Sequence, residues 1–93
     1  MFVHMAIHIP KPDKMRFVIE SMHRAKQAML DKPGLISVNV LQDGKGEKLI
    51  GLAMWDSKAD WEAAYPAMAE AVGNDPFDEW EDNPPEVFHL ENV

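Results

Sequence analysis

The chain has 93 residues, of which 46% are hydrophobic and 27% are charged. This length and balance are typical of one small globular domain and are too apolar for a disordered chain. Acidic residues outnumber basic ones by 16 to 9, which gives a formal net charge of −7. Binding to nucleic acids or anionic membranes depends on Lys and Arg, so the charge disfavours both. The sequence contains no cysteine, which excludes disulfides, thiolate metal sites and cysteine nucleophiles.

The sequence also predicts where the protein resides and how it assembles. No apolar run approaches the ~20 residues that cross a bilayer, and the N-terminus lacks the basic start and apolar stretch of a signal peptide. We therefore expect a cytoplasmic protein with a single domain over residues 1–93. A domain this short buries only roughly 60–65% of the surface that its unfolded chain exposes, so its own core is thin and a second subunit is favoured.

The first predicted elements are a strand and a helix. Residues 2–9 alternate between apolar and mixed side chains, the pattern of a strand with one wholly apolar face. Pro10 ends this strand. Over residues 14–30 apolar side chains recur at helical spacing, which predicts a helix packed by one stripe on a sheet. Pro33 and Gly34 end the helix, because proline lacks an amide donor and glycine tolerates a positive φ.

A β-hairpin follows. Two alternating runs, residues 35–41 and 49–55, flank a short turn that contains Gly44 and Gly46. The second run has one wholly apolar face and one face of small or aromatic side chains. We expect the wholly apolar faces of the strands to form the core under the helices.

The last third of the chain predicts a helix, a short turn and a strand. Ser57 begins the helix through a capping box with Asp60. Pro66 lies inside the helical pattern and predicts a kink or a restart. Residues 77–85 are acidic and fit a single helical turn, and residues 86–93 alternate as a last strand.

The element order β-α-β-β-α-β predicts an α+β, ferredoxin-like fold with an antiparallel sheet of strand order 4-1-3-2. The helices of such a fold cover only one face of the sheet. On the expected arrangement the other face carries apolar side chains that water does not tolerate. These are Phe2, Leu41, Leu49, Trp55 and Val87. We therefore expect a homodimer that buries this sheet face.

Three short motifs lie at the joints of these elements. Lys11-Pro12-Asp13-Lys14 follows the first strand, Pro33-Gly34 opens the second, and Trp55-Asp56-Ser57-Lys58-Ala59 closes the third. With the strands around them they resemble the antibiotic biosynthesis monooxygenase family of dimeric α+β barrel proteins, over nearly the whole chain. The resemblance implies oxygenation of polyketide phenols without a cofactor, haem degradation, quinol oxygenation, or a role of another kind.

The resemblance separates two of these branches. The haem-degrading branch has a catalytic Asn, a helix Trp and an iron-ligating His at positions that fall on Met5, Ala64 and Asn74, so none of the three is present. We therefore expect no prosthetic group. The branch that oxygenates aromatic molecules has a Trp near the end of the third strand, which Trp55 matches. Gly51 stands where that branch has an Asn.

Histidines are the candidate bases. His4 and His8 share a strand face but lie ~13 Å apart at strand rise, so they cannot bind one metal ion, and we expect no metal site. His89 should lie beside one of them. A histidine can deprotonate a phenol or enol, because its pKa is near neutral pH. His8 or His89 would be this base, with Asn39 or Trp55 polarising the product oxygen. The alternative is that the histidines lie half-buried at the dimer face.

A binding site would use apolar and aromatic side chains. The predicted substrate-binding residues are Met5, Met22, Trp55, Trp61 and Tyr65. Alternatively, Trp55 closes the end of the sheet and the methionines fill the core. Phe77 and Trp80 either make the acidic segment a lid over the pocket mouth or belong to a solvated tail.

Together these features predict a monooxygenase-like protein that acts without a prosthetic group on a small hydrophobic molecule, aromatic and of the phenol, quinol or polyketide type. The alternative is a non-catalytic, dimeric, small-molecule-binding or regulatory module of the same fold.

Overall fold

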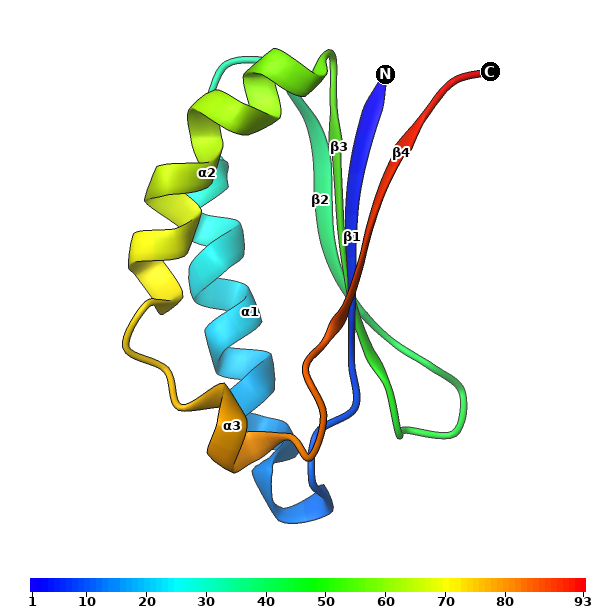
Figure 1. Ribbon diagram of the computed structural model, residues 1–93, viewed down its shortest axis with the longest axis vertical. Helices are drawn as coiled ribbons and strands as arrows, with labels where there is room; N and C mark the ends of the chain where they lie inside the picture. Colours follow the sequence, from blue (N-terminus) through cyan, green and yellow to red (C-terminus); the bar gives the residue numbers. More distant parts are fainter.

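The computed structural model describes residues 1–93, and it has helices on one face of a four-stranded antiparallel sheet (Figure 1). The elements in chain order are β1 (Phe2–His8), α1 (Met15–Met29), β2 (Leu35–Gln42), β3 (Leu49–Trp55), α2 (Lys58–Val72), α3 (Phe77–Trp80) and β4 (Glu86–Glu91). The strand order β2-β3-β1-β4 confirms the predicted ferredoxin-like α+β fold with order 4-1-3-2. No helix is both long and apolar enough to cross a membrane.

The joints between elements follow the predicted local chemistry. Gly34 has φ +84°, and a Cβ there would collide with the side chain of Asp60, so the position requires glycine. Its carbonyl accepts a hydrogen bond from the amide of Asp56, which ties the start of β2 to the end of β3. In the hairpin turn, the Asp43 carboxylate accepts hydrogen bonds from the amides of Glu47 and Lys48 at 2.8 and 3.0 Å.

The helix α2 begins as predicted at Ser57. The Ser57 hydroxyl accepts from the amide of Asp60 at 3.2 Å and donates to the Asp60 carboxylate at 2.9 Å. Pro66 lies inside one continuous helix, so the alternative of a restart is wrong, while the ribbon of α2 changes direction along its length (Figure 1). A proline in a helix interior donates no hydrogen bond to the preceding turn, which permits this bend.

The helices cover the mixed face of the sheet, and the prediction that they cover its wholly apolar face is wrong for β1 and β3. Phe2, Leu49 and Trp55, expected on the uncovered face, are each at most 2% exposed. The register of β1 and β3 explains why the helices cover the mixed face. Phe2 pairs with Trp55 and Leu49 pairs with His8, so large side chains lie at both ends of the mixed face. Ala6 pairs with Gly51 between them, and these small residues leave room beneath the helices.

The predicted orientation of β2 is confirmed from Val38 onward, whereas Ile36 lies at an irregularity of the strand and is 52% exposed. Val38 pairs with Ala53 and Val40 with Gly51, which places both valines on the helix side, and Leu41 lies on the opposite face.

The sheet face that is wholly apolar on β1 and β3 is therefore uncovered within one chain, and we call it the outer face. Alternation along the strands assigns to it the apolar residues Val3, Met5, Ile7, Leu41, Ile50, Leu52, Met54, Phe88 and Leu90 and the polar residues Ser37, Asn39 and Glu86. Val87, expected there as well, pairs with Ala6 on the helix side at the sheet edge.

Candidate functional site

A cavity of about 250 Å³ lies between the mixed face of the sheet and the helices α1 and α2. We call it the inner cavity. Its floor is made of the small residues Ala6, Gly51 and Ala53, with Met22 and Ala25 of α1 opposite. A Cβ on Gly51 would lie 3.3 Å from the terminal methyl of Met22, so a larger residue there would narrow the space. Further apolar lining comes from Met29, Val38, Val40, Met68 and Val72. This lining suits an apolar ligand.

A histidine–carboxylate pair stands at the wall of the inner cavity. The Nδ1 atom of His8 lies 2.8 Å from a carboxylate oxygen of Glu81, and both side chains are buried. The other Glu81 oxygen accepts from the amide of Ile9 at 3.1 Å. The amide of Lys11 donates to the Trp80 carbonyl at 2.8 Å and holds the two segments together.

This pair defines which His8 nitrogen is available. In the neutral form of the His8 ring, a carboxylate that accepts the Nδ1 proton leaves the lone pair on Nε2. An imidazole oriented by a carboxylate is the arrangement of a general base.

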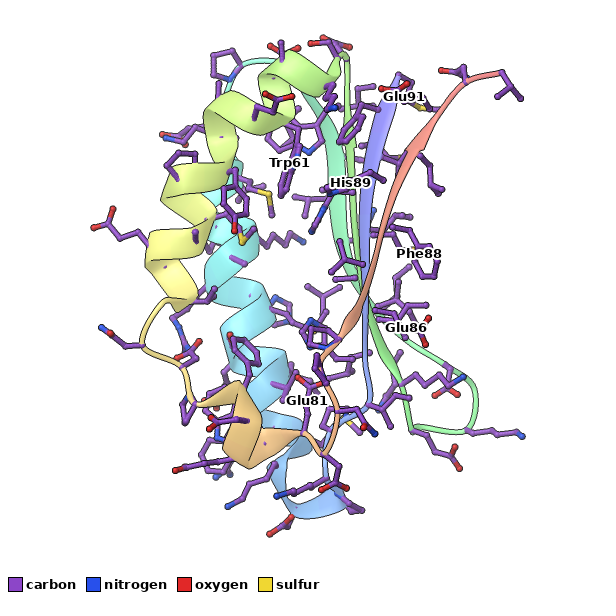
Figure 2. All side chains as sticks on the ribbon, viewed as in Figure 1. Trp61, Glu81, Glu86, Phe88, His89 and Glu91 are labelled. Carbon is purple, nitrogen blue, oxygen red and sulfur yellow. The ribbon has the colours of Figure 1, made fainter.

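A second histidine pair lies farther along β1. The Nδ1 atom of His4 is 2.9 Å from Nε2 of His89 on β4, which confirms the predicted contact between β1 and β4 histidines. The His4 ring also stacks on Trp61, with ring centroids 4.1 Å apart (Figure 2 labels Trp61 and His89). Burial, and then the neighbouring His89, lower the pKa of His4 to about 4, so His4 is neutral at neutral pH.

An open hollow of about 620 Å³ lies beside the edge strand β4, and we call it the edge groove. It is lined by His4, Trp61, Glu62, Tyr65, Met68, Val87 and His89. His4 and Met68 line the inner cavity as well, so these two side chains stand between the two hollows.

The segment of residues 73–85, which includes α3, covers the other end of the inner cavity, where Phe77 and Pro85 line it. We call it the α3 segment. Trp80 packs on α1, with its ring stacked 5.8 Å from that of Phe17. Figure 2 places Glu81 in this part of the molecule, between α3 and the sheet.

A second carboxylate fastens the α3 segment to α1. One oxygen of Asp75 accepts from the hydroxyl of Ser21 and from the guanidinium of Arg24, each at 2.6 Å. Ser21 is fully buried and lines the inner cavity. Two carboxylates, one contacting α1 and one contacting β1, therefore hold this segment in place, and it is not a solvated tail along its whole length.

The structure brings the predicted site residues to two places. His8 and Met22 line the inner cavity. Trp61, Tyr65 and His89 line the edge groove, which separates the two candidate bases His8 and His89. The histidines of β1 lie under the helices, so the alternative that places them at a dimer face of the sheet is wrong.

Three other predicted site residues lie outside both hollows or present only backbone to them. Trp55 is fully buried in the core beside Phe2, and its indole N–H has no hydrogen-bond partner. Met5 lies on the outer face. Asn39 borders the inner cavity, but it pairs with Leu52 and its side chain belongs to the outer face.

Two polar residues of the site were missed. Ser21 follows Val18 by three positions and precedes Ala25 by four, so the helical stripe already contained it. Glu81 stands among several acids in a segment with no strong periodicity, and no local signal distinguishes it. Its role depends on contacts with β1, about seventy positions earlier in the chain.

The described side chains include no group of three or more His, Asp or Glu residues placed to hold a metal ion. The inner cavity with its buried pair of His8 and Glu81 is the main candidate site of the chain.

Comparison with known proteins identifies the fold through structure. No protein-family model matches the sequence, and no curated protein matches it. Rv0793 from Mycobacterium tuberculosis is similar at TM-score 0.85 and 15% identity, covering 99% of this chain and 94% of that one. A solved antibiotic biosynthesis monooxygenase matches at TM-score 0.80 and 14% identity, covering 100% and 99%. A protein from Nitrosomonas europaea, provisionally named an antibiotic biosynthesis monooxygenase, is similar at TM-score 0.75 and 17% identity. The match covers 100% of this chain and 99% of that one.

These sequence identities are too low to transfer an activity from the similar proteins to this chain. The structural agreement over whole chains shows that the chain shares their fold. The chain has the monooxygenase-like, ferredoxin-type α+β fold of the solved antibiotic biosynthesis monooxygenases.

Proposed function

We propose that the protein is a monooxygenase that uses no prosthetic group and oxidises a small aromatic phenol or quinol held in the inner cavity. The observation that carries the proposal is the buried pair of His8 and Glu81 at the wall of an otherwise apolar cavity. A base with a defined free nitrogen beside an apolar binding space is what ionisation of a phenol or enol requires.

The proposed chemistry starts with His8. Its Nε2 takes the hydroxyl proton, and the electron-rich ring carbon of the resulting anion transfers electrons to dioxygen and bonds to it. His8 returns its proton to the peroxide. It then takes the remaining C–H proton while the O–O bond breaks, the carbon becomes a carbonyl, and the departing oxygen leaves as water. One oxygen atom enters the product, and the substrate supplies all four electrons.

The size of the inner cavity limits how many rings a substrate can have. A cavity of roughly 150 Å³ is large enough for benzene. The inner cavity, at about 250 Å³, suits a ring system of one or two rings. A multi-ring polyketide, which the resemblance includes, is larger than this space.

A second candidate function is a non-catalytic binding or regulatory module. It is favoured by the positions of Trp55 and Asn39, the two residues expected to polarise the product oxygen. The indole of Trp55 is buried in the core, and the Asn39 side chain lies on the outer face. The two functions share the cavity and differ in whether bound phenol consumes oxygen.

Oxygen uptake with a panel of naphthols and quinols, which have one or two rings, tests the proposal. We expect uptake by wild type and a fall in kcat of about 10²–10⁴-fold in His8→Gln, the usual contribution of a positioned base. Glutamine can still donate to Glu81, so the buried pair keeps a hydrogen bond. The matched control is His23→Gln on the exposed side of α1, which should retain the wild-type rate.

Two results would contradict the proposal. Equal rates for His8→Gln and wild type would remove His8 as the base. Calorimetric binding of these phenols with no oxygen uptake by any of them would establish the binding module instead.

We also propose that the protein is a homodimer through the outer face. That face is apolar along β1 and β3 and carries Phe88 at 38% and Leu90 at 45% exposure on β4, and no element of the chain covers it. Sedimentation at micromolar concentration should give twice the mass of one chain. Leu52→Asp, at the middle of this face, should shift the equilibrium toward monomer, whereas wild type sedimenting as a folded monomer would refute the dimer.

A further inference from the structure

The two ends of the inner cavity differ in how they are closed. At the His8 end, the α3 segment is fastened by Asp75 and Glu81, whose carboxylates accept hydrogen bonds from α1, from the His8 ring and from the β1 end. The contacts of Glu81 and the contact between Ser21 and Asp75 are buried or partly buried, and the contact between Arg24 and Asp75 is exposed. Together they hold the α3 segment against the His8 end of the cavity.

At the opposite end the wall consists of side chains that face open space on their other side. His4 and Met68 line both the inner cavity and the edge groove. Methionine is unbranched and changes rotamer readily, so Met68 can move without a change in the backbone. A ligand in the cavity can therefore extend toward the edge groove past His4 and Met68.

The edge groove is a suitable surface for an apolar chain. Tyr65 and Val87, which line it, are 48% and 52% exposed, and the buried Trp61 lines it as well. The only carboxylate in the groove is Glu62, which disfavours an anionic group in the same place.

The length of the site points the same way. His4 and His8 are four residues apart on β1, or ~13 Å at strand rise. A single ring whose hydroxyl contacts His8 fills only part of the distance from His8 to His4. The remaining distance, and the edge groove beyond it, can hold another part of the same ligand.

We propose that the ligand is a phenol or quinol that carries an apolar chain, with its ring in the inner cavity at His8 and its chain passing between His4 and Met68 into the edge groove. This assignment rests on the proposed binding of a phenol in the inner cavity. It adds the substrate class: an alkyl- or isoprenoid-substituted phenol, elongated and uncharged along its chain.

Calorimetric titration with 4-alkylphenols, from phenol to 4-hexylphenol, tests this without any need for turnover. In wild type, Kd should fall about three- to fourfold for each methylene that enters the path and then level off. Val87→Asp and Tyr65→Ala should each weaken 4-hexylphenol binding at least tenfold and leave phenol binding within twofold. Leu30→Asp is the matched control, because Leu30 is 50% exposed but lies at the end of α1, outside the groove.

The outcomes distinguish failure of the chain-in-groove assignment from failure of the proposed phenol site. Binding of phenol at a Kd that does not change with chain length would overturn the chain-in-groove assignment and leave the cavity as the phenol site. A chain-length effect that Val87→Asp and Leu30→Asp weaken equally would overturn it too. Failure of every phenol to bind, chain-free ones included, would overturn the proposed function and this assignment together.

Discussion

Replacing Trp55 with alanine is expected to lower the free energy of unfolding by about 3–5 kcal/mol, the range for removal of a buried tryptophan. Trp55 has no exposed surface and packs in the larger core cluster with Phe2, Trp61 and Ala64. A domain of this size has a total stability of roughly 5–14 kcal/mol, so a large part of it depends on this side chain. Urea denaturation followed by circular dichroism measures the change.

The Trp55→Phe variant tests whether the indole N–H contributes to stability. The indole N–H of Trp55 has no hydrogen-bond partner, so phenylalanine loses packing but no hydrogen bond, and it removes a buried unsatisfied donor. We expect a loss of about 1–2 kcal/mol. A loss as large as that of the alanine variant would mean that the N–H has a partner. A fall in oxygen uptake in a stable Trp55→Phe protein would return Trp55 to the list of catalytic candidates.

The sequence was sufficient for the elements and their order, because the signals that define them are local. The cap at Ser57, the positive φ at Gly34 and the turn around Asp43 are each determined within a few residues. The strand order follows from the element order once the fold class is recognised. Each of these features depends on hydrogen bonds or sterics that neighbouring residues supply.

The choice of sheet face failed because it depends on shape as well as on hydrophobicity. Val3, Ile50 and Leu52 make the more apolar face, and apolarity alone assigns them to the core. The helices instead pack over Ala6 and Gly51, where small side chains leave the space that becomes the inner cavity. Hydrophobicity alone therefore does not decide which face of a sheet the helices cover.

The candidate site was predicted only in part, because some of its contacts join segments that are distant in the sequence. His8 was identified from its residue type and strand position, and Met22 from the helical stripe. Glu81 was not, because its function comes from a contact between the α3 segment and β1 that no local pattern encodes. Glu81, the residue that contacts His8, could therefore be found only from the folded structure.

Replacing Glu81 with alanine is expected to lower the free energy of unfolding by about 3 kcal/mol. The change leaves the buried His8 Nδ1 and the part-buried Ile9 amide without their acceptor, and it releases the α3 segment from β1. Chemical denaturation measures the loss. Glu79→Ala is the matched control, since Glu79 is an exposed acid two residues earlier in the chain, and it should change stability by less than about 0.5 kcal/mol.

Glu81→Gln separates the structural role of this residue from its chemical role. The glutamine oxygen can still accept from Ile9 while its amide donates to Nδ1 of His8, so we expect a stability loss of only about 1 kcal/mol. That donation forces the His8 proton onto Nε2, the nitrogen that faces the ligand, and removes the base. Oxygen uptake should therefore fall about as far as in His8→Gln, on the order of 10²-fold or more. A Glu81→Gln protein that is stable and fully active would show that Glu81 only fastens the α3 segment and that the tautomer of His8 does not matter for the reaction.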